Sequence, residues 1–152
     1  MTFIYDAIIA INMGDRILIL GRGPSGSGKT TMMNNLASLC CSKTPIILSA
    51  DDYFMVDGEY QFDVNKLKDA HAQCQRLADE YMGLGERIVM IDNTNTMRWE
   101  MEPYLELAEK HDYSVVIAQT NWKSEDVELY AERNIHGVPL ATIYNQMERW
   151  EA

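Results

Sequence analysis

The sequence predicts one α/β domain of three layers, in which helices cover both faces of a mainly parallel sheet of four to five strands and a helical lid region follows at the C-terminal end. Short apolar runs alternate along the chain with stretches of helical periodicity, as in parallel sheets with helical crossovers. The runs are continuously apolar, which is typical of strands buried on both faces. Because 152 residues match the size of one domain, residues 1–152 are assigned to a single domain.

The first half of the chain contains one strand–helix–strand unit. Residues 16–20 form a short run rich in Ile and Leu, which predicts a strand that enters a glycine-rich turn. Residues 30–41 carry apolar side chains at helical spacing, and residues 45–49 repeat the buried-strand pattern. Crossovers of this kind are right-handed, and ligands bind outside the carboxyl ends of the strands that they join.

Helices and strands continue to alternate over the second half. A helix is expected over residues 64–81, because its apolar positions share one face and Gly83 and Gly85 supply a stop signal. Another is expected over residues 102–111, since proline is tolerated in the first turn of a helix and Pro103 would lie there. The remaining expected elements are strands over residues 87–91 and 113–118 and two helical stretches within residues 124–152, separated at residues 136–139.

The charge of the chain is acidic and unevenly distributed. Its formal net charge of −10 argues against a broad nucleic-acid-binding face, because such faces gain affinity from many Lys and Arg side chains. Residues 1–50 nevertheless hold four basic side chains against two acidic ones, whereas the rest of the chain holds nine against twenty-one. We therefore expect a local anion site near the glycine-rich turn.

Cysteine usage and hydropathy indicate the compartment. Cys40, Cys41 and Cys74 form no Cys-x-x-Cys pair, which fits reduced thiols better than a disulfide framework. No apolar run approaches the roughly 20 residues needed to span a bilayer. We expect a soluble cytoplasmic protein without a membrane partner. The role of residues 1–15, which could add a strand or cover an edge, and the oligomeric state stay open.

The glycine-rich turn matches the phosphate-binding pattern G-x-x-x-x-G-K-[ST] in full. The match consists of Gly23, Pro24, Ser25, Gly26, Ser27, Gly28, Lys29 and Thr30. Glycines let the backbone curl so that its N–H groups point at phosphate oxygens. Lys29 would contact the β- and γ-phosphates and Thr30 would offer a hydroxyl ligand to Mg²⁺, so ATP and Mg²⁺ are the expected cofactors. A purely structural turn is the alternative, and the position between a strand and a helix argues against it.

Polar side chains follow the next two predicted strands. Asp51 or Asp52 could accept the proton of an attacking hydroxyl, although a solvated loop with a helix N-cap is the commoner fate of such a pair. Asp92, Asn93 and Asn95 form either a ligand site or a hydrogen-bonded loop anchor. Asp92 lacks the adjacent Glu with which a hydrolytic motor activates water, which favours transfer to a hydroxyl over hydrolysis.

Arg133 is a candidate for a group that closes over the site. It ends a predicted helix immediately before a connection that contains Gly137. A guanidinium on such a connection can cover the transferred phosphoryl group and offset its charge. The alternative is a cation that simply faces the negative end of the helix dipole.

Four segments together resemble the 5′-polynucleotide kinase family, both its phage members and, most closely, its small kinase-like domains of the NEDD4-binding protein 2 type. The segments are residues 23–31, 49–54, 91–95 and 133–139. The resemblance implies transfer of the γ-phosphoryl group of ATP to a 5′-hydroxyl end of DNA or RNA.

The resemblance also implies roles for individual residues. It makes Lys29, Asp51 and Arg133 the catalytic residues, with Asp51 as general base and Arg133 as lid arginine, and it extends the ATP site to Thr31. The expected substrate-binding residues are Asp52, Asn93 and Asn95. Asn93 stands where phage members carry an Asp, and Phe54 stands where some carry an Arg that holds the acceptor's phosphate, so both contacts are changed here.

Two other functions share these features. A kinase of a small hydroxylated metabolite or nucleotide would use the same cradle, base and lid, and the scarcity of basic side chains beyond residue 50 favours it. A regulatory module that binds ATP without efficient chemistry would keep the cradle but would not need a base at Asp51.

Overall fold

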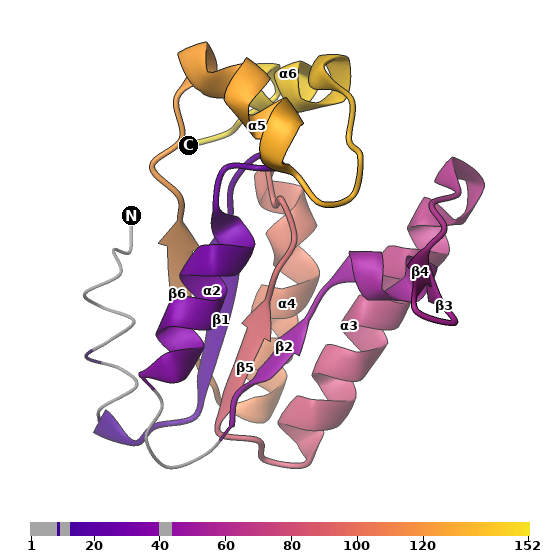
Figure 1. The fold of residues 1–152 in the computed structure, drawn as a ribbon. Coiled ribbons are helices and arrows are strands. Elements are labelled where there is room, and N and C mark those ends of the chain that lie inside the picture. Colours follow the sequence, from indigo (N-terminus) through magenta and orange to yellow (C-terminus); the bar gives the residue numbers. More distant parts are fainter. Residues whose placement is uncertain (1–8, 10–12, 40–43) are drawn as a thin grey trace.

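The protein is described by a computed structural model that covers residue 9 and residues 13–39 and 44–152. The expectations for residues 1–15 and for Cys40 and Cys41 therefore lie largely outside the described residues. In the described part, four strands form one parallel sheet in the order β2-β5-β1-β6 (Figure 1). The strands are β1 (Ile17–Arg22), β2 (Ile46–Leu48), β5 (Ile88–Ile91) and β6 (Ser114–Gln119). This sheet confirms the predicted α/β class and the parallel arrangement.

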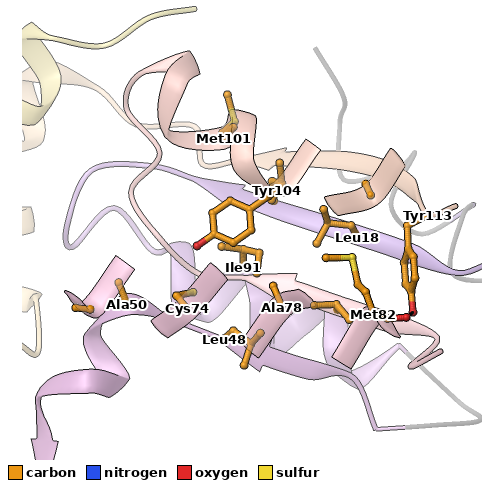
Figure 2. Close-up of a cluster of buried hydrophobic side chains, with 14 of the residues drawn as sticks. Leu18, Leu48, Ala50, Cys74, Ala78, Met82, Ile91, Met101, Tyr104 and Tyr113 are labelled. Atoms are coloured by element: carbon orange, nitrogen blue, oxygen red, sulfur yellow. Dashed lines mark hydrogen bonds between the residues drawn. The ribbon is translucent and has the colours of Figure 1, made fainter. Parts of the chain in front are cut away.

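Helices cover both faces of the sheet, as the continuous apolar runs predict. The helices are α2 (Lys29–Ser38), α3 (Leu67–Gly83) and α4 (Arg98–His111). Alternate residues of β1 point to opposite faces, so that Ile17 and Ile19 pack with α2 while Leu18 and Leu20 pack with α3 and α4. The buried apolar cluster around Leu18 and Leu20 is the larger of the two and is drawn in Figure 2. Because the four strands are parallel, their carboxyl ends all lie at one edge of the sheet.

The C-terminal part of the chain lies across that edge. It contains the short 3-10 turn η3 (Ser124–Asp126) and the helices α5 (Val127–Arg133) and α6 (Leu140–Glu148). Figure 1 shows α5 and α6 above the carboxyl ends of the strands, over the connection from β1 to α2. Tyr130, Ile143 and Met147 form a small buried cluster of their own between these helices. The predicted helical lid region is thus present. In the described part of the chain, no helix is long and apolar enough to cross a bilayer.

Two short strands were not predicted from the sequence. β3 (Met55–Val56) and β4 (Glu59–Tyr60) pair as an antiparallel hairpin between the 3-10 turns η1 (Ala50–Phe54) and η2 (Val64–Lys66). The turn residues Asp57 and Gly58 both have positive φ, at 50° and 84°, which is the backbone of a two-residue hairpin turn. The Asp-Gly signal was available in the sequence, but strands of two residues carry no recognisable apolar pattern.

The predicted start of α4 was wrong by one turn. We expected the helix to begin at Glu102, but it begins at Arg98, so Pro103 lies inside it. The Glu100 carboxylate explains the earlier start, because it accepts hydrogen bonds from the Thr96 hydroxyl at 3.0 Å and the Met97 N–H at 2.8 Å. These bonds hold the first turn in place. The proline then removes a single donor from the helix interior.

Arg22, the last residue of β1, connects the sheet edge to the C-terminal residues. It is buried, and its Nε donates to the Asn95 carbonyl at 2.8 Å. A second guanidinium nitrogen donates to the carbonyls of Thr96 at 3.1 Å and Glu151 at 2.6 Å. The guanidinium also lies 4.3 Å from the centre of the Trp150 ring. This side chain fixes the loop after β5 and the end of the chain against the phosphate loop.

We expect Arg22→Ala to lower the free energy of unfolding by about 2–4 kcal/mol, because three carbonyls lose a charged donor and a buried space is left. A matched control is Arg16→Ala. Arg16 is exposed, and its guanidinium carbon lies 5.7 Å from the centre of the Tyr113 ring. That change should cost less than about 1 kcal/mol. Denaturant unfolding of both variants measures the difference, and equal losses would contradict the anchoring role of Arg22.

Candidate active site

The phosphate loop joins β1 to α2 at the sheet edge. Gly26 and Gly28 have φ values of 77° and 95°, a conformation that glycine adopts without strain. A Cβ atom at Gly26 would overlap the backbone oxygen of Tyr130 in α5. The lid region is therefore packed directly on the loop, and Gly26 permits this close approach as well as the backbone curl.

Two side-chain contacts support the loop from outside its own segment. The Ser27 hydroxyl lies 2.8 Å from the Thr120 hydroxyl, just after β6. Gln146 in α6 is buried, and its carbonyl oxygen accepts the Ser25 N–H at 2.9 Å while its amide nitrogen donates to the Ser25 hydroxyl at 3.1 Å. We did not predict Gln146, because it lies 121 residues from Ser25 and no local pattern marks it.

Lys29 and Thr30 both contact Asp92, the residue that follows β5. The Lys29 ammonium lies 3.4 Å from Asp92 Oδ1, and the Thr30 hydroxyl donates to Asp92 Oδ2 at 2.9 Å. The two charged side chains are nearly buried, with exposed fractions of 11% for Lys29 and 9% for Asp92. Sequence reasoning considered Asp92 but assigned only Thr30 to a metal. The structure shows the two side chains as immediate neighbours.

The pair Thr30 and Asp92 fits a magnesium ion. Asp92 Oδ1 is buried and accepts no hydrogen bond from the part of the chain that the structure describes, so this oxygen has free ligand capacity beside Lys29. A hydroxyl and a carboxylate are hard oxygen ligands, and Mg²⁺ in phosphate sites commonly takes one or two protein ligands with phosphate and water completing its shell. Among the described residues, no group of three or more His, Cys, Asp or Glu side chains could hold a metal by itself.

Asp51 lies in η1, immediately after the neighbouring strand β2. Its Oδ1 accepts a hydrogen bond from the Tyr60 hydroxyl at 3.0 Å, and its Oδ2 lies 3.5 Å from His136 Nε2. The carboxylate thus has one neighbour from the hairpin and one from the lid region. It remains 43% exposed, so a hydroxyl from solution can reach it.

Asp52 has a different role from its neighbour. Its carboxylate accepts the Ser49 N–H at 3.2 Å, and the Ser49 hydroxyl accepts the Asp51 N–H at 3.2 Å. This is a reciprocal cap of the 3-10 turn, which is the alternative that the sequence left open for the pair. Burial, and to a smaller extent the nearby Asp51 carboxylate, raises the pKa of Asp52. Direct contact of Asp52 with a substrate stays a prediction.

Asn93 and Asn95 are buried and satisfied within the protein. Asn93 accepts the Ala50 N–H at 2.8 Å and donates to the Tyr104 hydroxyl at 3.3 Å, which ties the Asp51 turn to the loop after β5. Asn95 has a φ of 47° and donates to the Gly21 carbonyl at 2.7 Å. These contacts give both amides the loop-anchoring role that the sequence offered as an alternative, and substrate binding by either stays a prediction.

Arg133 ends α5 and contacts the phosphate loop. Its Nε donates to the Gly26 carbonyl at 2.6 Å, and its guanidinium carbon lies 5.2 Å from the centre of the Tyr130 ring. The next residue, Asn134, shapes the connection to α6, because its amide donates to the Ala131 and Val138 carbonyls at 2.8 and 3.1 Å. The Arg133 side chain is exposed, but its hydrogen bond to Gly26 holds it at the loop.

The α5–α6 connection touches both halves of the site. Arg133 contacts the phosphate loop, and three residues later His136 contacts Asp51 and packs its ring 4.2 Å from that of Tyr60. We predicted Arg133 but neither His136 nor Tyr60. No sequence pattern marks the hairpin tyrosine, since it contacts Asp51 only because β3 and β4 fold back toward η1.

A parallel sheet with a phosphate loop after its central strand, carboxylates after neighbouring strands and a helical segment across the edge defines a P-loop domain of the kinase-like class. The chain belongs to the AAA_33 family of AAA domains, whose model matches residues 18–136. Residues 137–152, which include Gln146, lie beyond that match.

The chain is also similar to individual proteins and solved structures. NEDD4-binding protein 2 of Homo sapiens is 42% identical over 137 residues, which cover 89% of this chain and 8% of that protein. The chain thus spans less than a tenth of this curated relative. A structure of the Pnkp1/Rnl/Hen1 RNA repair complex aligns with a TM-score of 0.68 at 15% identity, over 89% of this chain and 44% of the other. The AvrRxo1-ORF1:-ORF2 structure with ATP aligns with a TM-score of 0.64 at 14% identity, over 94% and 50%.

Proposed function

We propose that the domain transfers the γ-phosphoryl group of ATP to the 5′-hydroxyl end of a polynucleotide. One observation carries the proposal: Arg133 at the end of α5 contacts the phosphate loop, and His136 in the connection that follows contacts the Asp51 carboxylate. A phosphate donor and a hydroxyl acceptor bound on the two sides of this connection would meet between these groups. That arrangement suits transfer between two bound molecules better than hydrolysis.

The phosphate loop is the donor side. Its backbone N–H groups and Lys29 suit the β- and γ-phosphates, and Thr30 with Asp92 would hold Mg²⁺, which offsets negative charge on the phosphate oxygens when bound. Because Lys29 is already drawn toward Asp92, nucleotide binding would replace this ion pair with contacts to phosphate. ATP as the donor is supported by the similar AvrRxo1 structure, which contains ATP.

The Asp51 carboxylate is the acceptor side. In the proposed reaction the acceptor oxygen attacks the γ-phosphorus, the bond from that phosphorus to the β,γ-bridging oxygen breaks, and Asp51 takes the proton of the attacking hydroxyl. The Tyr60 hydroxyl and His136 hold the two carboxylate oxygens in a fixed orientation. Arg133 would offset charge on the transferred group. ADP and a 5′-phosphorylated end are the products.

The class of acceptor rests on two kinds of support. The four sequence segments resemble 5′-polynucleotide kinases, and the fold resembles a chain of an RNA repair complex. The acidic charge beyond residue 50, with nine basic against twenty-one acidic side chains, favours a second candidate, a small hydroxylated metabolite or nucleotide. Such an acceptor would not need the basic surface that a long polyanion prefers.

Transfer of labelled γ-phosphate from ATP tests the proposal directly. The acceptors are a short oligonucleotide with a 5′-hydroxyl, the same oligonucleotide with a 5′-phosphate as control, a 3′-mononucleotide and a panel of small hydroxylated metabolites. We expect strong label on the 5′-hydroxyl oligonucleotide, weaker label on the 3′-mononucleotide and none on the other acceptors. Label confined to a small metabolite would move the acceptor to the second candidate. ATP binding without label on any acceptor would indicate a regulatory module.

A further inference from the structure

We propose that Tyr60, Phe62 and His136 form a stacking site for the base of the acceptor's terminal nucleoside. This inference rests on the proposed function and specifies how the acceptor is recognised. The three residues come from the hairpin strand β4, the segment that follows it, and the α5–α6 connection. They lie beside the Asp51 carboxylate, where the attacking hydroxyl would have to be placed.

The three rings form a continuous aromatic row. The Tyr60 and Phe62 rings are stacked, with centres 6.5 Å apart and planes inclined by 18°, and the His136 ring lies 4.2 Å from Tyr60 at 33°. Phe54 supports the row from inside the protein: it is only 2% exposed and packs edge-on against Tyr60 and Phe62 at 6.1 and 5.1 Å. A buried ring beneath fixes the orientation of the rings above it.

Tyr60 connects this row to the reacting group. Its hydroxyl donates to Asp51 Oδ1 at 3.0 Å, so only the phenol C–O bond and this hydrogen bond separate the Tyr60 ring from the carboxylate. The sugar of a terminal nucleoside bridges a comparable gap between its 5′-hydroxyl and its base. A base stacked along the row would therefore leave its own 5′-hydroxyl within reach of Asp51. Burial, and then the Asp51 charge, raises the pKa of Tyr60, so the hydroxyl stays a neutral donor.

Exposure makes the row available to a ligand. Phe62 is 55% exposed although it is a large apolar side chain, and Ile135, next to His136 in the connection, is 79% exposed. A fold that needed Phe62 only for its core would be expected to cover it. The Asp51 carboxylate is also partly exposed, so the ring and the carboxylate are both accessible from solution.

Base stacking would also explain how an acidic protein can bind a nucleic-acid acceptor. A base offers a flat π-face whatever its identity, and base–aromatic stacking needs no positive charge. With a net charge of −10, the protein is poorly suited to track a long phosphate backbone. A site that grips the terminal nucleoside by its base can act on a nucleic-acid end without that surface. The rate should accordingly depend only weakly on salt concentration.

The test compares two acceptors: a 5′-hydroxyl oligonucleotide and the same oligonucleotide with an abasic 5′-terminal residue. The full chain should use the abasic end with a kcat/KM lower by about tenfold or more, mainly through a higher KM. Phe62→Ala should lose a similar factor on the normal end and little on the abasic end. Phe62→Trp should restore the preference. Leu84→Ala is the matched control, because Leu84 is an exposed apolar side chain just beyond α3, and it should change the use of neither acceptor.

Each other outcome contradicts the site. Equal use of normal and abasic ends by the unaltered protein would overturn the stacking site and leave the proposed kinase activity intact. Phe62→Ala could lose equal factors on both ends, either because it misfolds or because the ring has only a structural role. Failure of Phe62→Trp to restore the preference for the normal end would then overturn the stacking site. Transfer to neither oligonucleotide would overturn the proposed function and this site with it.

Discussion

Asp51→Asn is expected to lower the rate of phosphoryl transfer by about two orders of magnitude or more while ATP binding stays unchanged. An amide has nearly the shape of the carboxylate, and its oxygen can still accept the Tyr60 hydroxyl, so the turn after β2 should keep its structure. The amide cannot take the proton of the attacking hydroxyl, and general-base catalysis typically contributes about 10²–10⁴ in rate. Single-turnover transfer and calorimetric ATP titration measure the two quantities separately.

The neighbouring residue supplies the matched control for this prediction. Asp52→Asn changes the charge by the same amount at the next position, but Asp52 caps the turn by accepting the Ser49 N–H. We expect a modest loss of stability and a change in rate of only a few fold. Similar rates for Asp51→Asn and the unaltered protein would remove Asp51 from the mechanism. A large rate loss in Asp52→Asn alone would move the base to that residue.

The main features of the fold could be predicted because they are local. The two inner strands, β1 and β5, are buried on both faces and therefore appear as continuous apolar runs, and helical periodicity marks the crossovers. The errors concern features that depend on only one or two residues. The first turn of α4 depends on one carboxylate, Glu100, and the β3–β4 hairpin depends on a two-residue turn between strands of two residues. Features this small leave almost no periodic signal.

The predicted site residues lie in segments with a recognisable local pattern, whereas the missed ones depend on contacts between segments. The phosphate loop is one contiguous segment whose chemistry requires particular residues at fixed spacing, so the sequence identifies it without a structure. His136 and Gln146 act through contacts with distant segments, and Tyr60 contacts Asp51 through the fold of the β3–β4 hairpin. The Gln146 bond to Ser25 spans 121 residues, and no pattern near Gln146 indicates that α6 packs on the loop. Such residues become visible only when the lid region is placed over the sheet edge.

Lys29→Ala is expected to weaken ATP binding by about 10- to 100-fold, because a contact between a lysine and the phosphates resembles a charge-assisted hydrogen bond, worth about 1.5–3 kcal/mol. The transfer rate should fall as well, since Lys29 would stabilise charge that develops on the phosphate oxygens. Isothermal titration with ATP and Mg²⁺ measures the affinity. Lys68→Ala, at an exposed position of α3, is the control for loss of one positive charge and should bind ATP normally.

The structure adds a second consequence of this change, which separates binding from folding. Asp92 is 9% exposed, and within residues 13–39 and 44–152 its side chain contacts Lys29 and the Thr30 hydroxyl, so removal of the Lys29 charge leaves a nearly buried carboxylate with the Thr30 hydroxyl as its described partner. We expect the nucleotide-free variant to lose about 1–3 kcal/mol of unfolding free energy. Adding Asp92→Asn removes the unpaired charge and should restore most of that stability without restoring ATP affinity. If the double variant regained both, Lys29 would act only by neutralising Asp92 and not by contacting phosphate.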